Sequence, residues 1–90
     1  MAHHASPGSG ETNGIRRRVV LLVKEAGIAI ITLTHAPRES LIASRDPRCS
    51  APSIRSFTDP QFARSIFLHT VHSSERHGWR IIYDGPPLEG

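Results

Sequence analysis

Cysteine, lysine, aromatic residues and long apolar runs are all scarce in this chain of 90 residues. A single cysteine, Cys49, excludes an intramolecular disulfide and is typical of a protein from a reducing compartment. The longest uninterrupted apolar run covers residues 19–23, whereas roughly twenty apolar residues are needed to span a bilayer. We therefore expect a cytoplasmic protein that does not enter a membrane.

Catalytic sequence patterns are also missing. The chain has no Gly-x-Ser-x-Gly nucleophile elbow, no Cys-x-x-Cys motif and no glutamate flanked by histidines at zinc-binding spacing. Its eight carboxylates are scattered, and no identifiable base accompanies Cys49. These absences favour a protein that is not an enzyme and has no cofactor, with a metal-dependent or other enzyme as the third hypothesis.

Histidine is plentiful, and two of the six histidines have a spacing that metal sites use. His69 and His72 lie three residues apart on a predicted helix, with Glu75 one step further. Each such step turns by roughly 60° around the helix, so the three side chains spread over the surface instead of converging on one ion. We interpret His69 and His72 as part of a hydrated helix face, and predict no metal site.

Positive charge is concentrated in the middle of the chain. Residues 15–57 contain eight basic and three acidic residues, a net charge of +5, while residues 1–14 and 58–90 each carry −1. Such a segment predicts, as an alternative function, binding to a phosphate backbone without reading of bases. Since no aromatic residues are interleaved with the bases, duplex or structured RNA is favoured over a single strand. The candidate residues are Arg16, Arg17, Arg18, Arg38, Arg45, Arg48 and Arg55.

The N-terminal region differs in composition from the rest. Up to residue 14 it consists mainly of Gly, Ser, His and Ala, with no large apolar side chain after Met1. Such a composition cannot offset the entropy lost on ordering the chain. We therefore predict a disordered tail over residues 1–15 and a single small domain over residues 16–90, which is too short to form two cores.

The first half of this domain predicts two strands. Residues 16–26 fit either a helical stripe or a strand, and their three valines within five residues favour the strand. Residues 25–27 would then make a tight turn into a second strand over 28–34, which is apolar on both faces and so central in a sheet. The alternative is a helix that ends at Gly27.

Residues 35–56 contain three prolines, at positions 37, 47 and 52, and six charged residues. This composition predicts an irregular crossing with one short strand at 41–43. The sequence leaves open whether the crossing is ordered.

The second half begins with a helix signal. Thr58 offers an N-cap hydroxyl, Pro60 suits the first turn, and Gln61 stands at the capping-box position. The helix should run over residues 59–76 and end at Gly78 in a left-handed cap. A strand over 79–83 follows. The predicted core joins one face of this strand to the helix, with Phe57 closing its end: Trp79, Ile81, Tyr83, Phe62, Ile66 and Phe67.

These elements predict an α+β domain, with a small three- or four-stranded sheet and one main helix packed on one face. Because the strands are apolar on both sides, the opposite face should keep an apolar surface. The first functional hypothesis is therefore a small interaction protein that self-associates as a homodimer or completes a protein partner through that face. A covering element formed by residues 37–56, or by 16–26 as a helix, would instead leave a self-contained monomer.

Overall fold

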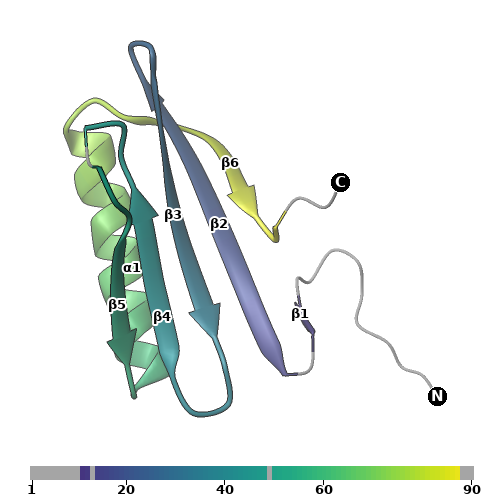
Figure 1. Cartoon of the computed structure of the whole chain (residues 1–90). Helices are drawn as coiled ribbons and strands as arrows, with labels where there is room; N and C mark the ends of the chain where they lie inside the picture. The colour runs from purple at the N-terminus through teal and green to yellow at the C-terminus, as the bar shows by residue number, and fades with distance from the viewer. Residues whose placement is uncertain (1–10, 13, 49, 88–90) are drawn as a thin grey trace.

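The computed structural model describes residues 11–12, 14–48 and 50–87, which form an antiparallel sheet with one helix (Figure 1). The predicted α+β class is confirmed. The sheet exceeds the predicted three or four strands, because five strands accompany the two-residue β1. The elements are β1 (Glu11–Thr12), β2 (Ile15–Lys24), β3 (Gly27–His35), β4 (Ser40–Arg45), β5 (Ser53–Phe57), α1 (Pro60–Arg76) and β6 (Arg80–Gly85).

β2 and β3 form the hairpin that the valine content favoured over a helix. Nine residue pairs join the two strands, from Lys24 opposite Gly27 to Arg16 opposite His35. The turn consists of two residues, and its first, Glu25, has φ 55°. This is the left-handed region, which is costly for a residue with a side chain.

The prediction of an irregular crossing over residues 35–56 is wrong in its second half. The short strand predicted at 41–43 is present and extends over β4, but β5 was not predicted. Four of its five residues are exposed, and its two apolar residues, Ile54 and Phe57, fall on opposite faces. β5 therefore lacks the periodic apolar pattern that predicts a strand. Residues Ser53–Phe57 are extended because they pair with β4.

The strands are ordered β1-β2-β3-β4-β5, and β6 also pairs with β2. Since β3 occupies one edge of β2, both β1 and β6 lie along the other edge. α1 connects β5 to β6 and contacts β3, β4, β5 and β6. In Figure 1 it lies behind β4 and β5, so it covers one face of the sheet.

The helix ends agree closely with the sequence. The N-cap is Asp59 and not the predicted Thr58, and its carboxylate accepts a hydrogen bond from the Gln61 N–H at 2.9 Å. Gly78 is confirmed in the left-handed conformation, with φ 97°. Its N–H donates to the Glu75 carbonyl, and the next N–H donates to the Ser74 carbonyl, which is the paired arrangement of a Schellman cap.

A basic side chain from the sheet also reaches the end of the helix. Lys24 Nζ, at the end of β2, donates to the His77 carbonyl at 2.7 Å. A positive charge is favourable where helix carbonyls lack partners, so this bond ties the β2–β3 hairpin to α1.

The core lies between α1 and the sheet. Phe67 is fully buried as predicted, and Trp79 and Ile81 pack against this core, which consists of Val20, Leu22, Ala29, Ile31, Leu33, Ile42, Ala63, Phe67 and Val71.

Two aromatic residues do not occupy their predicted core positions. Phe62 is 53% exposed and contacts Phe57 edge to face, with ring centroids 5.8 Å apart. Tyr83 does not share a face with Ile81. The register between β2 and β6 shifts, so that Tyr83 opposes Leu21 while Ile81 opposes the next residue of β2. Neighbouring strand residues point to opposite faces, so this bulge turns Tyr83 away from the helix.

Part of the predicted 1–15 tail belongs to the sheet. Glu11 and Thr12 pair with Arg16 and Ile15, and Ile15 begins β2. The rest of the predicted tail, apart from residue 14, lies outside the described residues. Over the part of the chain that the structure describes, no helix is both long and apolar enough to cross a membrane.

Candidate interaction surface

One face of the sheet is uncovered in the described part of the chain. Val20, Leu22, Ile31 and Ile42 are buried beneath α1, and the residues between them point the other way because side chains alternate along a strand. Residues 37–56 and 16–26, the two segments that could have covered this second face, are built into the sheet or its connecting loops. We call this surface the open face.

The centre of the open face is apolar. Cross-strand pairs place Val19 opposite Thr32, Leu21 opposite Ile30 and Val23 opposite Ile28, and β4 and β5 continue the surface. Three isoleucines are its exposed large apolar members: Ile28 is 61%, Ile30 37% and Ile54 65% exposed. The open face comprises Ile15, Arg17, Val19, Leu21, Val23, Ile28, Ile30, Thr32, Thr34, Leu41, Ala43, Arg45, Ile54, Ser56, Arg80 and Tyr83.

Three arginines lie at the margin of this apolar centre. Arg17 pairs with Thr34 near one end of β2, whereas Arg80 and Arg45 pair with Val23 and Ile30 toward the other end. All three side chains are exposed. At the outward strand positions that the structure describes, there is no aspartate or glutamate. The Ser56 hydroxyl of this face donates to Glu39 Oε1 at 2.9 Å, so one loop carboxylate also reaches the margin. The open face is therefore an apolar surface whose margin carries three arginines and one glutamate.

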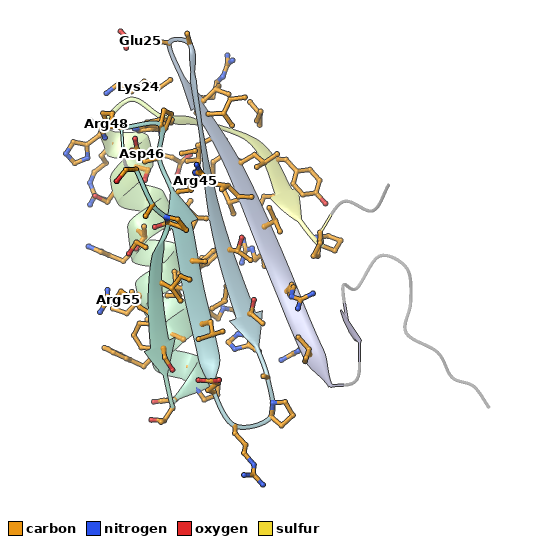
Figure 2. All side chains as sticks on the ribbon, in the orientation of Figure 1. Lys24, Glu25, Arg45, Asp46, Arg48 and Arg55 are labelled. Atoms are coloured by element: carbon orange, nitrogen blue, oxygen red, sulfur yellow. The ribbon has the colours of Figure 1, made fainter. Side chains whose placement is uncertain are left out.

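The seven arginines singled out from the sequence do not form one surface. Arg16, Arg18 and Arg55 occupy positions on the helix side of the sheet, and Arg17 and Arg45 are on the open face. Arg38 lies in the loop that follows β3, and Arg48 lies in the loop that follows β4. Figure 2 shows Arg45 and Arg48 at the hairpin end of the molecule, near Lys24, and Arg55 farther along β5.

Two of these arginines are engaged by carboxylates. Arg18 forms a salt bridge with Asp84, and Arg48 forms one with Asp46. Hydrogen bonds from Arg18 hold the pKa of the Asp84 carboxyl below its usual value, and the same interaction raises the pKa of the guanidinium. Arg48 lowers the pKa of Asp46 in the same way. Arg55 instead lies over the Phe57 ring, 5.2 Å from its centroid.

The histidines considered for a metal site lie on the solvent side of α1. His69 and His72 are both exposed. No group of three or more His, Cys, Asp or Glu residues that could hold a metal is found among the described residues. Cys49 lies outside them.

Arg80 could not be singled out from the sequence, because it lies outside the basic segment and reaches the open face only through the pairing of β6 with β2.

No protein-family model, curated protein or solved structure matches this chain.

Proposed function

We propose that this chain is a small non-enzymatic interaction protein whose open face binds an apolar, acid-bordered surface on a different protein. The observation that carries the proposal is the one-sided packing of the sheet. α1 covers one face, and exposed isoleucines from β3 and β5 remain on the other.

The apolar centre supports a docking role. Contiguous apolar patches on a protein surface are typical of interaction sites, because burying them against a partner removes apolar area from water. Ile28, Ile30 and Ile54 come from two strands and stand on one face. The apolar centre with an arginine margin matches the usual composition of protein interfaces, in which charge is depleted at the core and arginine is enriched.

The charge of the margin supports a different protein over a second copy of the chain. Two copies packed through their open faces would bring together Arg17, Arg45 and Arg80 from each, against one described carboxylate per copy, Glu39, which already accepts a hydrogen bond from Ser56. Like charges across an interface oppose binding, whereas carboxylates on a partner would complement these arginines. This argument favours the partner-binding form of the hypothesis.

A nucleic-acid backbone is a weaker match to the same arginines. Phosphate groups follow one another along a strand, so their binding needs a continuous basic track. Here the arginines are divided between the two faces of the sheet and its loops, and two of them are engaged by carboxylates. A nucleic acid cross-linked to the open face would therefore contradict the proposal.

The first experiment measures the oligomeric state of the purified chain by light scattering over a range of micromolar concentrations. We expect a monomer that binds an apolar dye, with Ile54→Lys reducing dye binding. His72→Lys is the control, because it places a new charge on the solvent side of α1. A dimer that Ile54→Lys dissociates would overturn the proposal and identify the second copy as the occupant.

The second experiment identifies the occupant directly. A photo-crosslinking amino acid is placed at Ile54 and, as a control, at His72, and the products formed in extracts of the source cells are identified. We expect a protein joined from position 54 and not from position 72. Purified, that protein should bind the chain directly, and changing Arg17, Arg45 and Arg80 to Glu should weaken binding at least tenfold. A cross-linked nucleic acid, or binding indifferent to the three changes, would contradict the proposal.

A further inference from the structure

Three basic side chains from different elements surround cavities at one end of the helix-covered side of the sheet. Arg16 comes from β2, His35 from β3 and Arg64 from α1. Two neighbouring cavities, of about 270 and 190 Å³, are each lined by all three. We call this group of three residues the basic cluster.

The fold brings the cluster together from distant parts of the sequence. Arg16 and His35 are a cross-strand pair of the β2–β3 hairpin, so they lie on the same face. Arg64 lies in the first half of α1, and the larger cavity also includes Leu33, which α1 covers. The basic cluster lies on the side of the sheet opposite the open face, although the larger cavity is also lined by Arg18 and by Arg17 of the open face.

Among the residues whose side chains the structure describes, no carboxylate lines either cavity. The acids of the surrounding elements have other partners: Asp84 binds Arg18, Asp59 caps α1, and Glu39 accepts a hydrogen bond from the Ser56 hydroxyl. On β1, Glu11 is the cross-strand neighbour of Arg16. Arg16 and Arg64 form no ion pair with any side chain that the structure describes.

His35 is held in place by a buried hydroxyl. Its Nδ1 lies 2.7 Å from the Oγ of Ser40, which is 1% exposed. Burial, together with the charges of Arg16 and Arg64, lowers the pKa of the His35 imidazole below 6.5. The two guanidinium charges thus add to the effect of burial in opposing protonation of the imidazole.

We propose that Arg16, His35 and Arg64 form a binding site for one compact phosphate-type oxyanion, either inorganic phosphate or the phosphate group of a small molecule. Guanidinium groups bind such oxyanions through paired, charge-assisted hydrogen bonds. The imidazole adds a donor when it is protonated. A single phosphate is favoured over a polymer because the two cavities are small, about 270 and 190 Å³.

Binding of the anion must be linked to the charge of His35. The bound anion offsets the two guanidinium charges, so the pKa of His35 rises on binding. By reciprocity, affinity for phosphate dianion should increase as the imidazole becomes protonated. Inorganic phosphate itself titrates in the same range, so sulfate, whose charge does not change there, provides the matched probe for this linkage.

The test is an NMR titration of the full chain with inorganic phosphate, at constant ionic strength maintained with chloride. We expect saturable shifts of Arg16, His35 and Arg64 resonances, and a rise in the pKa of His35 but not of His72. Arg64→Gln and Arg16→Gln should each weaken binding at least about fivefold, as loss of a charge-assisted hydrogen bond predicts.

The matched control is Arg76→Gln, which removes the same charge from the same helix about 18 Å away along its axis. It should leave phosphate affinity unchanged within twofold. Far-UV circular dichroism establishes that each variant is folded. If an arginine variant unfolds, the proposal is tested on the unaltered chain instead. A rise in the pKa of His35 on adding phosphate supports the site, and an unchanged pKa overturns it.

One further ligand, glycerol phosphate, distinguishes the sources of the phosphate. Glycerol phosphate binding more tightly than inorganic phosphate at the same residues would identify a small phosphate ester as the ligand, and the reverse order would identify the free ion. Absence of saturable shifts, an equal loss in Arg76→Gln, or binding of a short oligonucleotide without binding of phosphate would each overturn the proposal.

Discussion

Arg18 and Asp84 join β2 to β6 through a forked pair of hydrogen bonds. Arg18 Nε donates to Asp84 Oδ1, and Nη2 donates to Oδ2, both at 2.8 Å. The same guanidinium lies over Phe67 of α1, with its Cζ 5.4 Å from the ring centroid. One side chain thus connects the last strand to the centre of the helix-covered core.

Because this arrangement uses the planar fork of arginine, lysine should not replace it. Arg18→Lys keeps the charge but loses the paired hydrogen bonds and much of the stacking on Phe67. We expect a loss of about 1 kcal/mol in the free energy of unfolding, a figure that allows for solvent screening of this partly exposed pair. Urea unfolding measures it. Arg17→Lys, at the adjacent outward position, should change stability by less than about 0.5 kcal/mol, and an equal effect of both would contradict this role.

The same pair predicts acid sensitivity. Since Arg18 lowers the pKa of Asp84 below 3.8, the folded state favours the ionised carboxylate. The resulting stability is fully present above about pH 4 and is lost as the pH falls through the lowered pKa. The difference in unfolding free energy between the natural chain and Asp84→Asn should therefore shrink as the pH is lowered from about 5 to about 2. A difference that is constant with pH would show that the carboxylate charge does not matter.

His35 should produce a second pH dependence, nearer to neutrality. Its pKa is lowered in the folded chain, mainly by burial, so the unfolded chain binds the proton more readily. Stability is therefore lost as the pH falls from about 6.5, the unfolded value, through the folded pKa. His35→Asn, which keeps a polar group near Ser40, should remove this loss between about pH 7 and pH 5. A steeper loss of stability with falling pH in His35→Asn would show that the pKa of His35 is raised on folding and not lowered.

Phe67 is the residue on which the core most depends. It is fully buried, and Phe67→Ala should lower the free energy of unfolding by roughly 3 to 5 kcal/mol through lost apolar burial and a residual cavity. Exposed His72→Ala should cost no more than about 0.5 kcal/mol. The unfolding of the Phe67→Ala and His72→Ala variants is measured on heating, with and without a chelator. Equal damage from both changes, together with destabilisation by the chelator, would instead indicate a structural metal at the helix histidines.

The β2–β3 turn offers a stabilising change. Glu25 has φ 55°, a conformation that glycine adopts without steric cost, so Glu25→Gly should raise the free energy of unfolding by about 0.5 kcal/mol net of the added flexibility of the unfolded chain. Ala26→Gly is the control in the same turn. Because Ala26 is not in the left-handed region, that change should only destabilise. Stabilisation by both would mean that the turn conformation is not the cause.

The elements defined by short-range signals were the ones that could be predicted from the sequence. Asp59, Pro60 and Gly78 act on helix groups within a few residues of themselves, so the bounds of α1 follow closely from the local sequence. The β2–β3 hairpin is also local, because a two-residue turn places its strands side by side. The apolar character of both faces of these strands predicted that one face would remain uncovered.

Features that depend on distant pairing were decided only by the tertiary structure. β5 exists because β4 supplies its backbone partners, and the bulge of β6 against β2 separates Tyr83 from Ile81. The same long-range pairing brings Arg80 to the open face, and the crossing of α1 brings Arg64 near Arg16 and His35. Residue composition and spacing do not specify which strand edges meet, since that choice depends on how α1 packs over the whole sheet. The sequence therefore determined the local elements and their amphipathic character, whereas the positions of the charged groups around both candidate sites arose from the assembled fold.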